Sequence, residues 1–204
     1  MKPYNTLIGR SGLIHYLVLT LLAIIFLFPS LNRIIYWGIH DWDVHIMDHA
    51  VTRDSLVDYY QLPLWNPYKG GGCPALGHAR SICLSPLFIF FIIGGAVVGL
   101  KLMMTACMII GLIGTFKLAR SWGITVWGSY LAAFVFMFSS HFPLKIAEGT
   151  TEYYGQCWLP WIIFFASRTI NRQDRWIKYS IASAVAFTLL IFQGGGNDPA
   201  YNFL

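Results

Sequence analysis

The sequence predicts an all-α fold, a transmembrane helical bundle that crosses the bilayer several times. Of its 204 residues, 56% are hydrophobic and only 11% are charged, and the mean hydropathy is +0.58. Soluble domains carry roughly a quarter charged residues, so this composition is typical of a membrane protein. Several unbroken apolar segments also approach the length of about 20 residues that a membrane-spanning helix needs.

Five segments are predicted to span the membrane: residues 13–31, 97–119, 125–140, 154–170 and 177–192. The third and fourth are shorter than a typical span and need their aromatic flanks to complete the crossing. The first resembles a signal sequence, but its apolar run is long and ends at Phe28-Pro29-Ser30 without a small-x-small cleavage site. We therefore expect a retained anchor.

The distribution of charge predicts a cytoplasmic N-terminus. In that orientation 8 of the 14 basic residues fall in short cytoplasmic segments, which the positive-inside rule favours. The acidic residues fall on the opposite, outer side, with the exception of Asp174. Because no run of Lys and Arg is present, we expect no nucleic-acid partner. Any chemistry is expected on the outer face.

Residues 32–96 are predicted to form one long outer loop that carries the functional site. Connections longer than about 15 residues are usually functional or disordered, and the Trp, Tyr and Leu content argues against disorder. The first half of the loop has helical periodicity, with Asp41, His45 and Asp48 on one arc. The apolar stripe of the same helix consists of Val44, Met47 and Val51. This pattern predicts an amphipathic helix on the membrane surface.

The second half of the loop, residues 61–80, is rich in Pro and Gly and is not expected to form a regular helix. Trp65 and Tyr68 present flat rings there, which suit either the stacking of sugars and lipid headgroups or an interfacial aromatic belt. The apolar run 84–95 is too short to cross the bilayer. It is expected to form a re-entrant or surface helix that leads into the second span.

Three kinds of chemistry fit the acidic cluster "IHDWDVHIMDH" at residues 39–49. Asp41, His45 and His49, at i, i+4 and i+8, can converge on a metal ion, with carboxylate and imidazole suiting Mn or Zn and carboxylates alone suiting Mg. An aspartate beside lipid can instead act as a general base, because a low dielectric raises its pKa. A coupling-ion site of a transporter is the weakest of the three, because the predicted spans carry almost no ionisable residues.

A series of short motifs resembles one family of membrane enzymes. These motifs are "DWDVH" at 41–45, "PLWNPY" at 63–68, Ser85-Pro86, "KLARSWG" at 117–123, "VFMFSSHF" at 135–142, "WLPW" at 158–161 and "FQGGGNDPAY" at 192–201. In their order and spacing they resemble the GT-C superfamily of polytopic glycosyltransferases, most of all its bacterial and archaeal YfhO-type branch. The resemblance covers the chain from about residue 36 onward.

The resemblance implies transfer of a sugar from a polyprenyl-phosphate donor to a glycan, lipid or protein acceptor on the outer face of a bacterial or archaeal plasma membrane. It implies a catalytic aspartate in the first outer loop, acting as a base or as a metal ligand. Asp41 is the first candidate and Asp43 the second, and His45 would complete a site for Mg or Mn. Residues 1–204 are then expected to be the N-terminal part of a longer GT-C-like domain.

The same resemblance implies residues that bind the substrate. They are expected to be His45, Trp65, Asn66, His78, Arg80 and Glu152, with the cationic and hydrogen-bonding members contacting the donor phosphate. An alternative of a different class is a non-catalytic binder of polyprenyl lipids, or a flippase or transporter. Such a protein would bind the lipid carrier without turning it over.

Overall fold

The protein is described by a computed structural model that covers residues 10–36, 41–78, 80–171 and 173–194. The predicted all-α class is confirmed, because 76% of the structure is helical. Within the described ranges the only strands are β1 (Trp65–Asn66) and β2 (Cys73–Pro74), which form a two-residue antiparallel hairpin.

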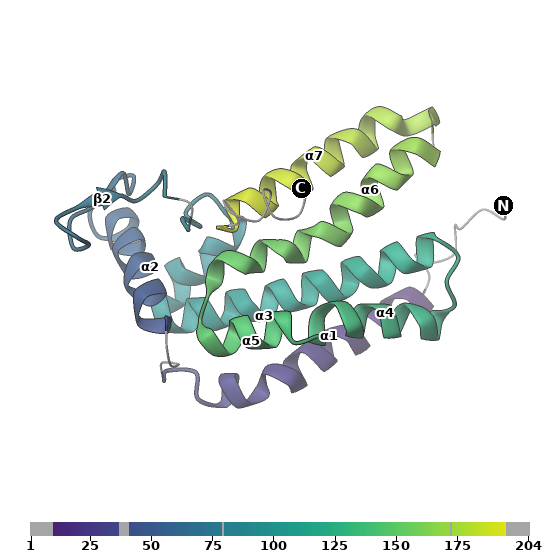
Figure 1. Ribbon diagram of the computed structural model, residues 1–204, viewed down its shortest axis with the longest axis horizontal. Helices are drawn as coiled ribbons and strands as arrows, with labels where there is room; N and C mark the ends of the chain where they lie inside the picture. Colours follow the sequence, from purple (N-terminus) through teal and green to yellow (C-terminus); the bar gives the residue numbers. More distant parts are fainter. Residues whose placement is uncertain (1–9, 37–40, 79, 172, 195–204) are drawn as a thin grey trace.

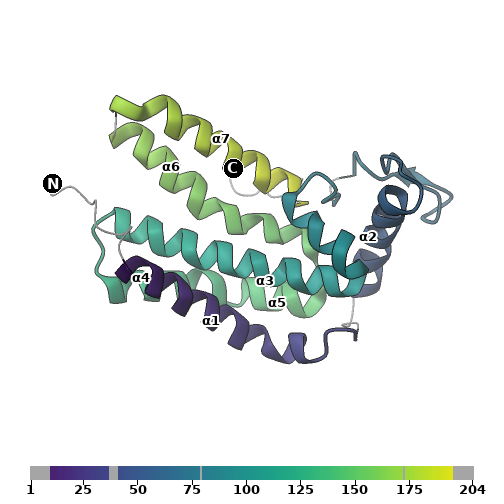
Figure 2. The same cartoon turned by 180° about the vertical axis from the view of Figure 1, so that it is seen from behind.

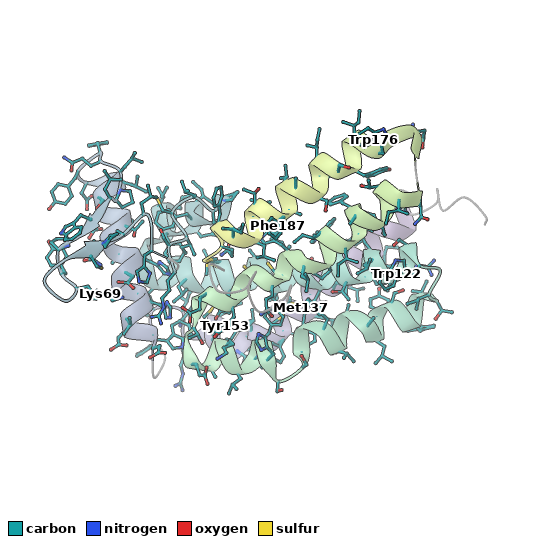
Figure 3. All side chains as sticks on the ribbon, turned by 45° about the horizontal axis from the view of Figure 1, so that its top comes forward. Lys69, Trp122, Met137, Tyr153, Trp176 and Phe187 are labelled. Carbon is teal, nitrogen blue, oxygen red and sulfur yellow. The ribbon has the colours of Figure 1, made fainter. Side chains whose placement is uncertain are left out.

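The helices follow one another as α1 (Arg10–Asn32), α2 (Trp42–Val57), η1 (Pro86–Phe88), α3 (Ile89–Ser121), α4 (Val126–Phe138), α5 (His141–Glu148), η2 (Thr151–Trp158), α6 (Leu159–Asn171), η3 (Gln173–Arg175) and α7 (Trp176–Phe192). Both ribbon views show α1, α3, α4 and α6 lying along one direction, with α7 against α6 (Figures 1 and 2). Helix α2 and the hairpin cover one end of this bundle, which we call the loop end. In Figure 3, Lys69 marks the loop end, and Trp122 and Trp176 mark the opposite end.

Among the described residues, three helical segments are long and apolar enough to cross a membrane: Gly12–Asn32, Pro86–Ser121 and Val126–Glu148. They cover the first three predicted spans, apart from residue 125 at the start of the third. Helices α6 and α7 have 13 and 17 residues. At about 1.5 Å per residue they rise roughly 20 and 26 Å, which is less than the roughly 30 Å hydrocarbon core. The membrane class is therefore supported, whereas a total of five spans stays a prediction.

Helix α3 is broken at Gly95, whose φ of 75° and ψ of 179° are accessible essentially only to glycine. The break separates residues 86–94, which we call the rim helix, from the long helix 96–121. The rim helix folds back onto the long helix: a Cβ added at Gly99 would lie 2.6 Å from the Cα of Phe91. A short apolar helix before the second span is thus confirmed.

The start of the rim helix is tied to the end of α7. Ser85 Oγ donates a hydrogen bond to Oε1 of Gln193 at 2.5 Å, and both side chains are buried. Ser85 also accepts a hydrogen bond from the backbone N–H of Leu87, which caps η1. Residues far apart in the sequence therefore fix where the rim helix begins.

The long part of α3 is the central helix, with separate clusters of buried side chains on its two sides. One cluster lies toward α2 and η2 and includes Trp42, Ile46, Phe91, Leu100 and Tyr154. The other lies toward α1 and α4. Small residues let the neighbouring helices approach closely, since Gly111 lies against Met137 and Gly114 against Trp161.

Lys101 is a buried cation within the long part of α3. Its ammonium group lies at the end of α1 and donates three hydrogen bonds to backbone carbonyl oxygens, those of Ser30 (3.2 Å), Arg33 (2.6 Å) and Tyr36 (2.7 Å). The last carbonyls of a helix lack partners within the helix, and the lysine binds one carbonyl in the last turn of α1 and two in the segment that follows it. Lys101 therefore places the end of α1 level with this point of α3.

Candidate functional site

Helix α2 forms where the sequence predicts it and is held at its start by α5. The backbone N–H of Asp41 donates to the carbonyl oxygen of Glu148 at 3.1 Å, and the indole Nε1 of Trp42 donates to that of Ala147 at 3.2 Å. The buried face of α2 carries Trp42, His45, Ile46, His49 and Thr52. Asp41, His45 and Asp48, which periodicity places on one arc, therefore differ in their surroundings: His45 is buried, Asp41 is exposed and Asp48 is partly buried.

The two aspartates that the resemblance puts first lie at the start of α2 and are exposed. Asp41 occupies the N-cap position without a capping hydrogen bond from its side chain. Asp43 accepts a hydrogen bond from the backbone N–H of Val44 at 2.8 Å. Neither lines the pocket described below. The catalytic role of these two residues stays a prediction.

Asp41, Asp43 and His45 do not form a set of metal ligands in this arrangement, because both carboxylates are exposed while the imidazole is buried. In the described part of the chain, no group of three or more His, Cys, Asp or Glu side chains has a metal-binding arrangement. As placed, the three residues do not fit the expected Mg or Mn ion, so no step of the proposed chemistry depends on one.

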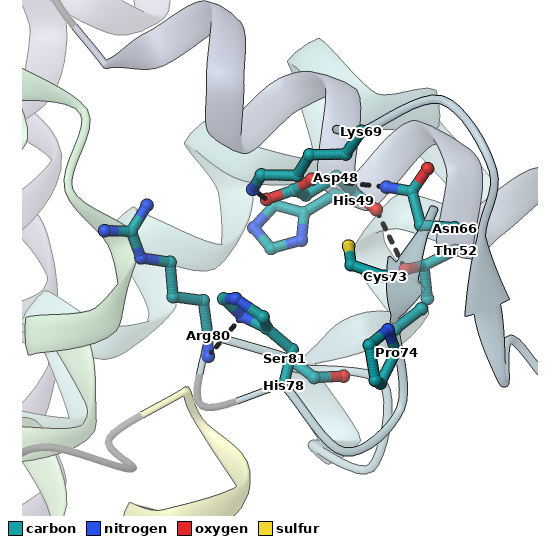
Figure 4. A pocket seen from close by; sticks show the side chains of 11 residues that line it. Asp48, His49, Thr52, Asn66, Lys69, Cys73, Pro74, His78, Arg80 and Ser81 are labelled. Carbon is teal, nitrogen blue, oxygen red and sulfur yellow. Dashed lines mark hydrogen bonds and ion pairs between the residues drawn. The ribbon is translucent and has the colours of Figure 1, made fainter. Parts of the chain in front are cut away.

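A pocket of about 20 Å³ lies at the loop end, between α2, the hairpin and the segment that follows it (Figure 4). Its walls are formed by Asp48, His49, Thr52, Asn66, Lys69, Cys73, Pro74, Ala75, His78, Arg80 and Ser81. This volume holds about one water molecule, so a larger ligand requires the walls to separate. Three predicted substrate-binding residues, Asn66, His78 and Arg80, meet in this pocket.

Asp48 is the carboxylate of the pocket wall. Its Oδ2 lies 2.8 Å from Nζ of Lys69, and its Oδ1 accepts a hydrogen bond from Nδ2 of Asn66 at 3.4 Å. Asn66 is buried and accepts a hydrogen bond from the backbone N–H of Tyr68 at 3.0 Å, which fixes its orientation. Helical periodicity predicts the position of Asp48 on α2 but assigns it no role. The sequence feature that could have indicated the ion pair with Asp48 is Lys69, which directly follows "PLWNPY".

Trp65 and Asn66 lie on opposite faces of the hairpin, because successive side chains of a strand alternate. Asn66 faces Asp48, whereas Trp65 is 55% exposed and its ring lies against Gly72. A Cβ added at Gly72 would come within 2.4 Å of the Trp65 ring. Trp65 therefore does not line the pocket, and both interpretations of its ring remain open.

Arg80 joins the pocket to η2 through Glu152. Its Nε lies 2.6 Å from Oε2 of Glu152, which is only 8% exposed. The backbone N–H of Arg80 donates to Nδ1 of His78 at 3.2 Å. Glu152, one of the expected substrate-binding residues, therefore contacts a pocket residue without lining the pocket itself, and its role stays a prediction. Arg80 is one wall of the pocket, so the pair lies beside it.

Two buried histidines of α2 lie at the pocket: His49 lines it, and His45 lies next to His49. His49 contacts the ring of Phe91 edge to face at 4.9 Å between centroids, and burial lowers its pKa to about 3, with a smaller effect of His45. Burial also lowers the pKa of His45, although the negative charge of Glu152 opposes this shift. Both imidazoles are therefore neutral near pH 7, and the cations that line the pocket are Lys69 and Arg80.

The pocket thus combines the basic side chains of Lys69 and Arg80, the carboxylate of Asp48 and two histidines, the neutral His49 and His78, at the end of a membrane bundle. Cations beside a small cavity suit an anionic group such as a phosphate, and the carboxylate suits proton transfer. No family model, no curated protein and no solved structure matches this chain. Its family resemblance is therefore carried by the sequence motifs alone.

Proposed function

We propose that the protein is a membrane glycosyltransferase of the GT-C type, which moves a sugar from a polyprenyl-phosphate donor to an acceptor hydroxyl. The observation that carries this proposal is that the Asp48 carboxylate and the Arg80 guanidinium line one pocket at the end of an apolar bundle. A lipid-linked phosphate resides at the same boundary between hydrocarbon and water. The motif series resembling the GT-C superfamily supports the same class.

In this proposal the donor phosphate binds Arg80 and Lys69. A guanidinium presents two parallel N–H donors that match phosphate oxygens, and an ammonium adds a point charge. In the structure each cation is paired with a carboxylate, Arg80 with Glu152 and Lys69 with Asp48. A bound phosphate competes with these carboxylates for the cations. Release of Lys69 would leave the Asp48 carboxylate able to accept a proton.

Each part of the transfer step can then be assigned to a residue of the pocket. Asp48 accepts the proton of the acceptor hydroxyl while that oxygen forms a bond to the anomeric carbon of the donor sugar. The bond from the anomeric carbon to the phosphate oxygen breaks, and its electron pair leaves with the polyprenyl phosphate. Arg80 and Lys69 stabilise the charge of this leaving group. Asp41 and Asp43 are the competing candidates for the base.

The proposal is tested in a strain that lacks the gene, by mass spectrometry of its glycolipids and glycoproteins. We expect one glycan to disappear and to return with the wild-type protein. It should also return with Asp58→Asn, an exposed aspartate at the end of α2 that serves as the matched control. Asp48→Asn should not restore the glycan, although the protein reaches the membrane at the same level.

Three other outcomes contradict parts of the proposal. Restoration by Asp48→Asn together with failure of Asp41→Asn would move the base to Asp41. If the glycans of the deletion strain are the same as those of the parent strain, the protein is not a glycosyltransferase and the proposal is wrong. Binding of polyprenyl phosphate by the purified protein, without turnover of any glycosylated form, would establish the non-catalytic lipid-binding alternative.

A further inference from the structure

The rim helix, residues 86–94, exposes a stripe made only of aliphatic side chains. Ile89, Ile92 and Ile93, spaced i, i+3 and i+4, are 47%, 39% and 79% exposed. On its other side Phe88 and Phe91 are buried against the protein core. A helix that is apolar on both sides, with one side uncovered, is stable only where that side meets an apolar medium.

The depth of the rim helix follows from its contacts with α3. Phe91 lies against Gly99, and two residues further along α3 Lys101 binds the carbonyl oxygens of Arg33 and Tyr36. These carbonyls lie just beyond Gly12–Asn32, the first segment able to cross a membrane. The rim helix is therefore level with the end of that span, at the boundary between hydrocarbon and headgroups.

The rim helix also lies directly beside the pocket. The Phe91 ring contacts His49 edge to face, and His49 lines the pocket. Nε of Arg53 in α2 donates to the carbonyl oxygen of Phe91 at 3.1 Å, which fixes the rim helix against α2. The Phe91 and His49 rings thus lie between the rim helix and the pocket.

We propose that the isoleucine stripe of the rim helix lies among lipid acyl chains, and that the rim helix is the lipid-side wall of the pocket. The occupant is lipid because the stripe contains no polar or aromatic side chain, whereas protein interfaces are enriched in aromatic residues and Arg. Resting on the proposed function, this wall is also where a lipid-linked donor passes from the bilayer to the pocket.

The lipid contact is tested by electron paramagnetic resonance on the full chain in lipid nanodiscs. A nitroxide is attached at Ile93→Cys in a background in which Cys73 and Cys83, the partly exposed cysteines of the loop, are replaced by Ser. Leu131→Cys, 66% exposed within the candidate span Val126–Glu148, provides the lipid reference. Asp58→Cys, exposed at the end of α2, provides the water reference.

We expect the label at position 93 to collide with oxygen severalfold more than with a water-soluble nickel chelate, as at position 131. Nickel collisions as frequent as at position 58 would place the stripe in water and overturn the proposal. Exclusion of both reagents would show that a protein segment covers the stripe, which also overturns it. Ile89→Cys repeats the measurement if the label at position 93 prevents folding.

The passage of the donor is tested separately by Ile93→Asn, which adds a polar amide to the stripe without removing a buried side chain. The KM for a long-chain polyprenyl donor should rise severalfold, while the KM for a water-soluble short-chain analogue stays unchanged. Equal effects on both donors would refute passage past the rim helix. Absence of transfer with either donor in the wild-type protein would refute the proposed function instead, and the spectroscopic result would stand by itself.

Discussion

Arg80 Nε lies 2.6 Å from Oε2 of Glu152, and this ion pair connects the segment after the hairpin to η2, which precedes α6. The carboxylate is buried, whereas the guanidinium is partly open to water and lines the pocket. A buried carboxylate without a partner is unfavourable, so the pair holds Arg80 at the pocket even without a ligand.

Arg80→Gln is expected to destabilise the protein because it leaves the Glu152 carboxylate buried without its cation. Since Arg80 is more than a third exposed, water screens part of the loss, and we expect about 1–2 kcal/mol. Thermal unfolding in detergent micelles measures the change. Arg175→Gln, which removes an exposed ion pair with Asp174, is the control and should have no measurable effect. Equal melting temperatures for the two variants would contradict the prediction.

Stability should fall as the pH is lowered from about 6.5 toward about 3, because of His49. The unfolded chain binds a proton near pH 6.5, whereas the folded state excludes it until about pH 3, so acid favours unfolding. One such proton changes the free energy of unfolding by about 1.4 kcal/mol per pH unit.

The measurement is the unfolding midpoint as a function of pH. His49→Leu should flatten the acid side of this profile, while His141→Gln, at an exposed histidine, should leave it unchanged. A profile for His49→Leu that is as steep as that of the wild-type protein would show that other groups carry the acid sensitivity. The buried His45 is the first such group to examine, because burial lowers its pKa too.

Lys101→Met is expected to loosen the end of α1. It removes three hydrogen bonds from a buried ammonium to carbonyl oxygens, at a cost on the order of 3 kcal/mol. Hydrogen-exchange mass spectrometry should show faster exchange in the last turns of α1. Lys178→Met, at an exposed position of α7, is the matched control. Unchanged protection of α1 in Lys101→Met would show that packing alone fixes this helix.

Gly95→Ala should destabilise the protein by about 1–3 kcal/mol, because an alanine cannot adopt this backbone conformation without strain. No atom lies within 4 Å of the added Cβ, so steric clash does not contribute. Gly77→Ala is the control, since Gly77 has equally open space and no positive φ. The midpoints of unfolding in sodium dodecyl sulfate should differ between the two variants. Identical midpoints would mean that the break at Gly95 tolerates a side chain.

The sequence was sufficient for the longest apolar helices and for α2 because their signals are local. Apolar length predicted the three segments able to cross a membrane, and periodicity predicted α2. Periodicity did not reveal that His49 is buried, because this depends on the Phe91 side of the rim helix, which packs against α2. The backbone conformation of Gly95 sets the position of the rim helix, and it cannot be predicted from the amino-acid composition.

The pocket was only partly predictable, because its walls come from distant segments. Asn66, His78 and Arg80 were expected to contact a ligand, and all three line the pocket. The place of Asp48 in the pocket was not predictable, because its pairing with Lys69 depends on the hairpin, and two-residue strands cannot be recognised in a Pro-rich stretch. Lys101 could have been singled out from the sequence, because an ionisable residue inside an apolar segment usually has a polar partner or a functional role.

The hydrogen bond between Ser85 and Gln193 has a consequence for how the protein is made. The two residues are 108 positions apart. At translation rates of about 5–20 residues per second, Gln193 leaves the ribosome roughly 5 to 20 s after Ser85. Throughout that interval the nascent chain holds a serine whose partner does not yet exist, so the final assembly of the rim helix must wait until α7 has been synthesised.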